Sequence, residues 1–266
     1  MTGSFPSGPA ARDVVHLSRP APLVALVTLD RPDSLNALDG HLVDGMTNLF
    51  TELADDDTVS VVVLTGAGRS FSSGADLSLL SEGFSAQPPV QMMRYVGRPV
   101  RELANLPQLT IAAVDGPAVG AGWGLAMACD IRIAGPRASF GATFVRMGLG
   151  PDYGLSTTLP QAVGRQRALE LLTTGRFVDA EEAVRIGLVT EVAESARTRA
   201  LQLAAEIATV PQRAVRSVKA TLRESEGCDI DQVVDRIEAR AQAALFEHPD
   251  FHTDASAWMS RHRSRA

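Results

Sequence analysis

Apolar and polar positions alternate in two different ways along the chain, and the pattern changes near Gly164. Before that point, short apolar runs rich in β-branched residues end in turn-forming residues, which is typical of buried strands. These runs predict strands at 23–30, 59–66, 110–116 and 129–135. Between the first two runs, apolar residues recur every three or four positions and predict a helix with one buried face: Leu38, Leu42, Met46, Leu49 and Leu53.

Strands separated by helices favour right-handed crossovers and therefore a layered α/β core with a largely parallel sheet. After Gly164 the pattern is helical, with Asp179 as a predicted N-cap and Pro211 at a helix boundary. We therefore divide the chain into a flexible N-terminal segment (1–20), a core (21–195) and a C-terminal helical region (196–266). The amphipathic helices predicted after Gly164 span 165–174, 179–188, 195–210, 213–225 and 231–246.

Composition narrows the classes of partner and compartment. The 266 residues are 45% hydrophobic, enough for one large core, and the formal net charge of −6 provides no basic field for nucleic acid. Cys129 and Cys228 form no CxxC motif and the histidines lack metal-ligand spacing, so we expect reduced thiols and no metal. No signal peptide or membrane anchor is recognisable, so we expect a cytoplasmic protein.

Two predicted strands each end in a glycine-rich turn followed by a helix start: "GAGRSFSSGADLSLL" (66–80) and "GPAVGAGWGLAMACD" (116–130). Such turns leave unpaired backbone N–H groups that suit an anion, and Gly74 and Gly120 allow close backbone approach. Asp76 is a candidate cap for the first helix. The glycine spacing fits neither a dinucleotide loop nor a P-loop, and no GxSxG motif is present.

Taken together, six segments occur in the order and spacing of one family: "RPDSLNALD" (31–39), "GRSFSSGADL" (68–77), "VDGPAVGAGWGLAMACDIRIA" (114–134), "ASFG" (138–141), "GLGPDYGL" (148–155) and "LTTGRFVDAEEAVRIGLVTEV" (172–192). The chain resembles the crotonase, or enoyl-CoA hydratase/isomerase, superfamily over roughly residues 20 to 260. This resemblance implies a spiral of ββα repeats, a C-terminal helical trimerisation region, an acyl-CoA thioester substrate and a homotrimer or dimer of trimers. Coenzyme A enters as part of that substrate, and no further cofactor is implied.

The resemblance also assigns site residues. The backbone N–H groups of Ser73 and Ala121 occupy the positions of the family's oxyanion hole, which accepts charge from the thioester oxygen. Arg31 is either a contact to a phosphate of coenzyme A or a solvated loop residue. The other residues that the resemblance places along the substrate are Asn36, Ala37, Leu38, Ser72, Gly74, Ala75, Asp76, Leu77, Gly120, Trp123, Gly124, Phe144 and Tyr153.

Hydratases of this family use two glutamates, and this chain has Gly124 and Phe144 at those positions. Efficient hydration would lack its acid and base. Asp152, in "GLGPDYGL", instead matches the single acid of the family's enoyl-CoA and epoxyphenylacetyl-CoA isomerases. We therefore expect Asp152 to move a proton from C2 to C4 of a 3-enoyl-CoA, its pKa raised by apolar surroundings. The alternative structural role is a cap on a helix that starts near Gly154.

Two other functions stay open at the sequence level. One is a hydratase that uses another acid, and the other is a non-catalytic acyl-CoA-binding protein. The segment 81–90 is either a pocket rim or a surface insertion. Asp115 and Asp130 lie in turns and are expected to be satisfied structural groups.

Overall fold

A computed structural model describes residues 14–76 and 88–263 of the chain. The predictions for Leu77 and for most of the segment 81–90 lie outside the described residues, as do those for the first thirteen and last three residues. The remaining predictions can be compared with the structure.

The larger sheet contains the four predicted strands as neighbours. Its order is β1-β2-β3-β4-β6-β9, and every pair from β2 onward is parallel. Continuous apolar runs suit such strands because helices cover parallel sheets on both faces. The bounds are β1 (Val15–Ala21), β2 (Val24–Leu29), β3 (Val61–Gly66), β4 (Leu109–Val114), β6 (Ile131–Ala134) and β9 (Glu191–Val192).

Strand β1 corrects the boundary of the predicted N-terminal segment. It pairs antiparallel with β2, with Val15 opposite Leu29, so residues 15–20 belong to the sheet. Of its side chains Val15 is buried and the following five are exposed. The pattern of apolar residues therefore does not predict this strand. Main-chain pairing at a sheet edge does not require an apolar sequence.

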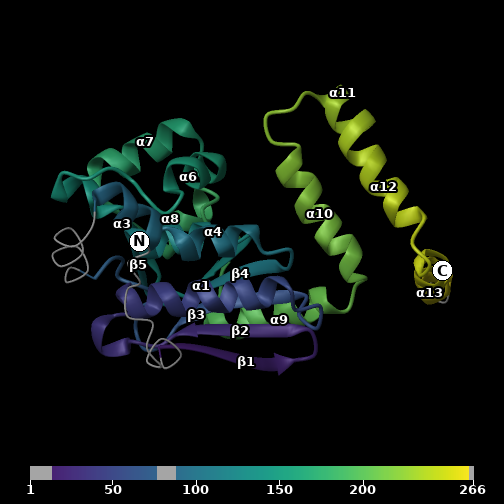
Figure 1. Ribbon diagram of the computed structural model, residues 1–266, viewed down its shortest axis with the longest axis horizontal. Coiled ribbons are helices and arrows are strands. Elements are labelled where there is room, and N and C mark those ends of the chain that lie inside the picture. The colour runs from purple at the N-terminus through teal and green to yellow at the C-terminus, as the bar shows by residue number, and fades with distance from the viewer. Residues whose placement is uncertain (1–13, 77–87, 264–266) are drawn as a thin grey trace. The chain divides into compact units, whose positions relative to one another are not determined.

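Helix α1 (Gly40–Ala54) follows β2 and packs partly against β1 (Figure 1). The Asp39 carboxylate caps it by accepting a hydrogen bond from the Leu42 N–H at 2.9 Å. Leu42, Met46 and Leu53 lie on its buried face as predicted. Leu38 is buried too, but it precedes the helix, because the chain becomes helical only after the Asp39 cap.

A smaller sheet, in the order β5-β7-β8, holds the second glycine-rich turn. β5 (Pro117–Val119) runs parallel to β7 (Ser139–Gly141), which pairs antiparallel with β8 (Phe177–Asp179). The Gly120 N–H donates to the Gly141 carbonyl at 2.8 Å and so anchors the turn to β7. Helix α5 (Ala121–Met127) starts directly after it.

Compact units divide the chain at 206/207 and not at the predicted 195/196. Helix α9 (Ala196–Ala208) begins within the first unit, because both Asp115 carboxylate oxygens accept hydrogen bonds from its first N–H groups, those of Ala196 and Arg197. Asp115 is thus a satisfied structural group, as predicted. Asp130 is one as well, since it accepts hydrogen bonds from the Thr110 N–H and hydroxyl at 2.8 Å.

Each helix predicted after Gly164 is present, with the Asp179 cap bonding to the Glu182 N–H and Pro211 immediately before α10. The helix predicted for 179–188 ends at Arg185, and the short strands β8 and β9 interrupt the part predicted to be helical. The other helices of the first unit are η2 (Pro32–Ser34), α3 (Pro89–Val96), α4 (Arg98–Asn105), η3 (Thr143–Met147), α6 (Leu155–Val163), α7 (Arg165–Thr174) and α8 (Ala180–Arg185). The second unit contains α10 (Gln212–Glu224), α11 (Ile230–Gln232), the π-helical turn η4 (Val233–Glu238), α12 (Ala239–Phe246) and α13 (Phe251–Arg263).

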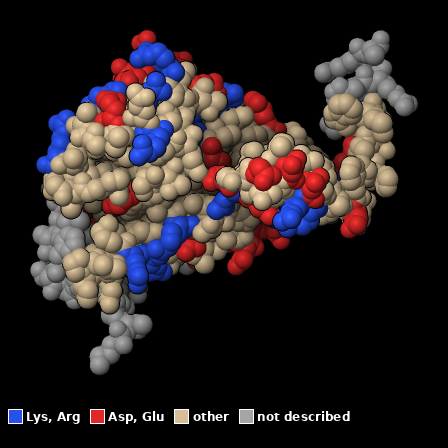
Figure 2. Space-filling model, turned by 90° about the horizontal axis from the view of Figure 1, so that it is seen from above, with Lys and Arg blue, Asp and Glu red and all other residues tan. Residues whose placement is uncertain are grey.

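Two surface properties bear on the predicted partners. Within the described residues, no helix is both long enough and apolar enough to cross a membrane. On the face shown in Figure 2, basic and acidic side chains are interspersed with uncharged surface.

Candidate active site

A cavity of about 790 Å³ lies where the two glycine-rich turns meet. Helix α3 and the segment 31–39 contribute one residue each, and the segment from Thr143 to Asp152 contributes the remaining wall. Most of the lining side chains are apolar, which favours a ligand with an apolar portion. The described lining residues are Ala37, Ser73, Gly74, Ala75, Asp76, Met93, Gly120, Ala121, Thr143, Phe144, Met147, Leu149, Gly150, Pro151 and Asp152.

The second turn presents the N–H of Ala121 at this cavity. Gly120 adopts a left-handed φ of 55°, which favours glycine, and Ala121 is the first residue of α5. The first N–H groups of a helix have no partner within it. Among the described residues no acceptor takes the Ala121 N–H, so this donor stays available to a ligand.

In the first turn, the N–H of Ser73 is not the available donor that was predicted. The Ser73 N–H already donates to the Leu35 carbonyl at 2.9 Å, so its assignment to an oxyanion hole is wrong. Leu38 donates to the Gly74 carbonyl at 2.8 Å and accepts from the Asp76 N–H at 3.0 Å. Ala75 lies between these two bonds, and in a parallel bridge its own N–H therefore faces away from Leu38. That N–H has no acceptor among the described residues, and Ala75 lines the cavity.

The two available amides belong to closely packed segments. A Cβ placed on Gly74 would lie 3.5 Å from the Ala121 nitrogen and only 2.7 Å from the Val119 carbonyl oxygen. Gly74 also has a left-handed φ of 94°. Glycine is therefore required at residue 74, where it lets the first turn pack against Val119 and Ala121, and both Ala75 and Ala121 line the cavity.

Asp152 supplies a carboxylate to the same cavity. Its Oδ1 atom is buried and has no hydrogen-bond partner in the structure. Burial raises the pKa of Asp152 to about 6, opposed by a hydrogen bond from its own backbone. The alternative role as a helix cap is wrong, because Gly154 caps α6 without any side-chain bond, and Asp152 offers only its main-chain carbonyl to the Leu155 N–H.

Tyr153 does not line the cavity but anchors the turn that carries Asp152. Its side chain is buried, its φ is 50°, and its hydroxyl donates to the Val96 carbonyl at the end of α3 at 2.5 Å. Burial raises the pKa of this phenol, so it remains a donor. The bond joins the turn that carries Asp152 to the helix that carries the lining residue Met93.

The segment 31–39 supports the site mainly from outside the cavity. Of its predicted substrate contacts only Ala37 lines the cavity, while Asn36 and Leu38 are buried. The Asn36 side chain accepts from the Arg31 N–H and donates to the Ala67 and Ser70 carbonyls. The Ser72 hydroxyl, also buried, donates to the Asn36 carbonyl at 2.8 Å.

Comparison with known proteins identifies the family to which this site belongs. The family model described as enoyl-CoA hydratase/isomerase matches residues 21–263. The chain belongs to the enoyl-CoA hydratase/isomerase family. The crotonase resemblance and the α/β fold class inferred from the sequence are thereby confirmed.

Several relatives of this family are similar along almost their whole length. A Mycobacterium tuberculosis protein named "Probable enoyl-CoA hydratase EchA14" is 41% identical over 90% of this chain and 94% of its own. A short-chain-enoyl-CoA hydratase of Clostridium acetobutylicum is 35% identical over 90% of this chain and 92% of its own.

Solved structures agree with this family assignment. The enoyl-CoA hydratase structure from Bacillus anthracis has a TM-score of 0.87 and 30% identity, covering 93% of this chain and 96% of that one. A structure from Thermobifida fusca, determined in complex with acetoacetyl-CoA, has a TM-score of 0.81 and 31% identity, covering 89% and 95%.

The resemblance assigns glutamates of hydratases to two positions that are Gly124 and Phe144 in this chain, and only one of the two residues lines the cavity. Phe144 lines it as predicted, whereas Gly124 lies beneath the turn at Tyr153. The resemblance placed Trp123 along the substrate, but Trp123 does not line the cavity. It is fully buried and packs against Phe140, with ring centroids 6.1 Å apart, because α5 directs this side chain into the core.

Several lining residues were missed by the sequence analysis. Met93, Met147 and Leu149 carry exposed or partly exposed apolar side chains at the cavity, and Thr143 adds a hydroxyl. The signal that could have found three of these was their place between the "ASFG" motif and Asp152. Met93 had no such signal, because its helix reaches the cavity only through the fold.

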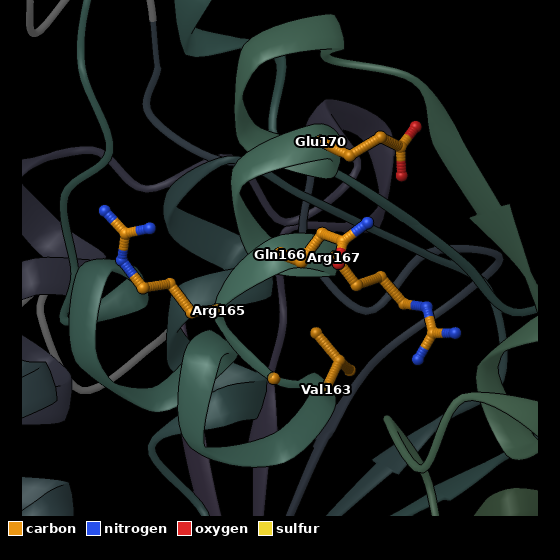
Figure 3. Close-up of a pocket in the computed structure, with 6 residues that line it drawn as sticks. Val163, Arg165, Gln166, Arg167 and Glu170 are labelled. Atoms are coloured by element: carbon orange, nitrogen blue, oxygen red, sulfur yellow. The ribbon is translucent and has the colours of Figure 1, made fainter.

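A second cavity, of about 480 Å³, lies at the start of α7. Arg165 and Arg167 line it, but Figure 3 shows their guanidinium groups pointing in different directions. Both side chains are exposed, as is Gln166 between them. Without converging donors this cavity offers no defined anion site.

Proposed function

We propose that the protein isomerises a 3-enoyl-CoA to a 2-enoyl-CoA, with Asp152 as its single acid and base. The observation that carries this proposal is the Asp152 carboxylate, whose Oδ1 atom is buried without a hydrogen-bond partner, in the lining of the cavity that Ala75 and Ala121 also line with unbonded amides. One carboxylate is sufficient for a reaction that moves one proton. Coenzyme A is part of the substrate, and the proposed reaction requires no further cofactor.

The first step breaks a C–H bond next to the thioester. Asp152 accepts the C2 proton, and the electron pair delocalises over the diene and the thioester oxygen. An acid with a pKa of about 6 is mostly ionised at neutral pH, yet basic enough to take part in proton transfer. The carboxylate that lines the cavity can accept that proton without first breaking a hydrogen bond at Oδ1.

The negative charge on the thioester oxygen is accepted by the Ala75 and Ala121 N–H groups. By analogy with other oxyanion holes, each donor would lower the barrier by about 3 kcal/mol. In the second step the protonated Asp152 returns the same proton to C4, and the double bond moves into conjugation with the thioester. Proton and charge therefore balance within one residue and two amides.

A second candidate is hydration of a 2-enoyl-CoA, and the names of the relatives from Mycobacterium tuberculosis and Clostridium acetobutylicum favour it. Hydration needs a group that positions water as well as an acid. Among the described lining residues, the carboxylates are Asp76 and Asp152, and Asp76 is already paired with Arg31 at 3.2 Å. A hydratase would thus depend on Asp152 together with the Thr143 hydroxyl.

The test is C2 proton exchange on a 3-enoyl-CoA in heavy water, followed by NMR, with hydration of crotonyl-CoA assayed in parallel. Wild type is compared with Asp152→Asn, which keeps the shape of the side chain but removes the base. Asp55→Asn is the matched control, because it removes an exposed carboxylate at the end of α1.

Exchange and double-bond migration that disappear only in Asp152→Asn are the expected result. Hydration without exchange would replace the isomerase by the hydratase. Tight acyl-CoA binding without either reaction would indicate a non-catalytic binding protein. A homotrimer or dimer of trimers stays a prediction, which light scattering of the purified protein checks.

A further inference from the structure

Arg31 was expected to be either a contact to a phosphate of coenzyme A or a solvated loop residue, and in the structure it is engaged by the protein itself. Its Nη1 atom donates to the Ala37 carbonyl at 2.5 Å and lies 3.2 Å from an Asp76 carboxylate oxygen. Its Nη2 atom lies 3.3 Å from an Asp39 carboxylate oxygen. Only 20% of the arginine side chain is exposed, so these three acceptors occupy most of its binding capacity.

These contacts surround the segment that presents the Ala75 amide. Asp76 follows Ala75 directly in the chain, and Ala37 precedes Leu38, whose backbone bonds hold Gly74 and Asp76. The direction of the Ala75 N–H is therefore fixed by the register of the segment 35–38 against the segment 73–76. Arg31 ties the two segments together at the end nearest the cavity.

We propose that Arg31 is a positioning residue for the oxyanion hole, acting through Ala37 and Asp76 to orient the N–H of Ala75. The inference rests on the proposed function for the use of that N–H, and it holds for either isomerisation or hydration. Arg31 also pairs with the second carboxylate at the cavity. An unpaired Asp76 next to the developing enolate would oppose the negative charge there.

Asn36 supports the other end of the same segment. It is fully buried, and its side chain uses one acceptor and two donors on the Arg31 N–H and the carbonyls of Ala67 and Ser70. A Cβ on Gly66 would lie 2.6 Å from the Asn36 amide nitrogen, so the amide fits closely against the end of β3. Asn36 thus fixes the start of the segment 35–38, and Arg31 fixes the end of that segment against the segment 73–76.

The experiment separates positioning from phosphate binding with two substrates that carry the same 3-enoyl group. One is the coenzyme A thioester, and the other is the N-acetylcysteamine thioester, which lacks all phosphates. Turnover of both is measured for wild type and Arg31→Gln. The matched control is Arg137→Gln, which removes an exposed arginine between β6 and β7.

A positioning role predicts a loss of kcat of about 10- to 100-fold on both substrates, because small misplacements of a catalytic group have effects of this size. KM for the coenzyme A thioester should change little. The 13C signal of a bound butyryl-CoA labelled at its carbonyl reports polarisation directly. It should move in Arg31→Gln from its wild-type position toward that of the free thioester.

A rise in KM for the coenzyme A thioester alone, with kcat intact, would overturn the inference in favour of a phosphate contact. An unchanged 13C shift in Arg31→Gln would also overturn it while leaving the proposed function in place. A wild-type complex without any carbonyl shift would remove the oxyanion hole itself and thus both proposals. Should Arg31→Gln unfold, Asp76→Asn tests the same pair and is expected to reproduce the 13C change.

Discussion

A side chain at residue 124 and the main chain of Tyr153 exclude one another. A Cβ placed on Gly124 would lie 2.4 Å from the Tyr153 Cβ and 2.8 Å from its carbonyl oxygen. Real side chains do not approach so closely. In this chain, therefore, the turn that carries Asp152 occupies the space that a side chain at residue 124 would need.

This contact predicts that Gly124→Ala displaces the turn at Asp152. We expect a loss of about 1–3 kcal/mol in the free energy of unfolding, as is typical of overpacking, and a large loss of kcat. Urea unfolding and the exchange assay measure the two effects. Gly40→Ala is the control, because its Cβ would meet only the Tyr95 hydroxyl at an ordinary 3.7 Å. Equal stability and activity in Gly124→Ala would show that the turn can move away freely.

Tyr153→Phe should separate anchoring from chemistry. Loss of the hydroxyl leaves the Val96 carbonyl at the end of α3 without this donor, and we expect a loss of about 1–2 kcal/mol in the free energy of unfolding. The kcat should fall less than in Asp152→Asn, since the carboxylate remains. Thr173→Val, which removes an exposed hydroxyl bonded to the Leu169 carbonyl within α7, is expected to change stability much less. Equal losses in both variants would argue against a special role of the Tyr153 bond.

The pH dependence of the reaction should follow the ionisation of Asp152. A general base works in its ionised form, so kcat/KM should fall as the pH drops through about 6 and level off above it. The N-acetylcysteamine thioester is the substrate of choice because it has no phosphate that titrates in the same range. A profile that stays level down to pH 4 would exclude Asp152 as the base.

The same carboxylate should reduce the stability of the folded protein at neutral pH. Its pKa is raised from 3.8 to about 6, so the folded state binds more protons than the unfolded state between these values, and stability falls as pH rises through them. Asp152→Asn should therefore be more stable than wild type by up to about 3 kcal/mol above pH 6. Urea unfolding should show this difference vanish below about pH 4.

The exposed Asp55→Asn variant is the control for that experiment and should show no such pH-dependent gain. A constant difference between Asp152→Asn and wild type at every pH would mean that burial of the charge is not the cause. The expected gain in stability with loss of activity is typical of a site where function requires an unfavourable group.

Much of the framework was predictable because it depends on local pattern. Apolar runs located β2, β3, β4 and β6, and amphipathic periodicity located α7 with its observed bounds. The edge strand β1 was not predicted, because main-chain pairing does not require a pattern of apolar residues. The family resemblance singled out Asp152, and its neighbours in the sequence led us to expect apolar surroundings. The structure buries its Oδ1 atom.

The sequence by itself determined the α/β class and the two glycine-rich turns, and the family resemblance singled out Asp152, which lines the same cavity. Only the tertiary structure decided that Ala75 and not Ser73 offers its amide, that Arg31 pairs with Asp39 and Asp76, and that Trp123 belongs to the core. The physical reason is that the direction of a backbone N–H in a turn depends on its partner. Here the partner segment, 35–38, lies more than thirty residues earlier in the chain. No local pattern specifies which of its carbonyls will accept a hydrogen bond from the turn.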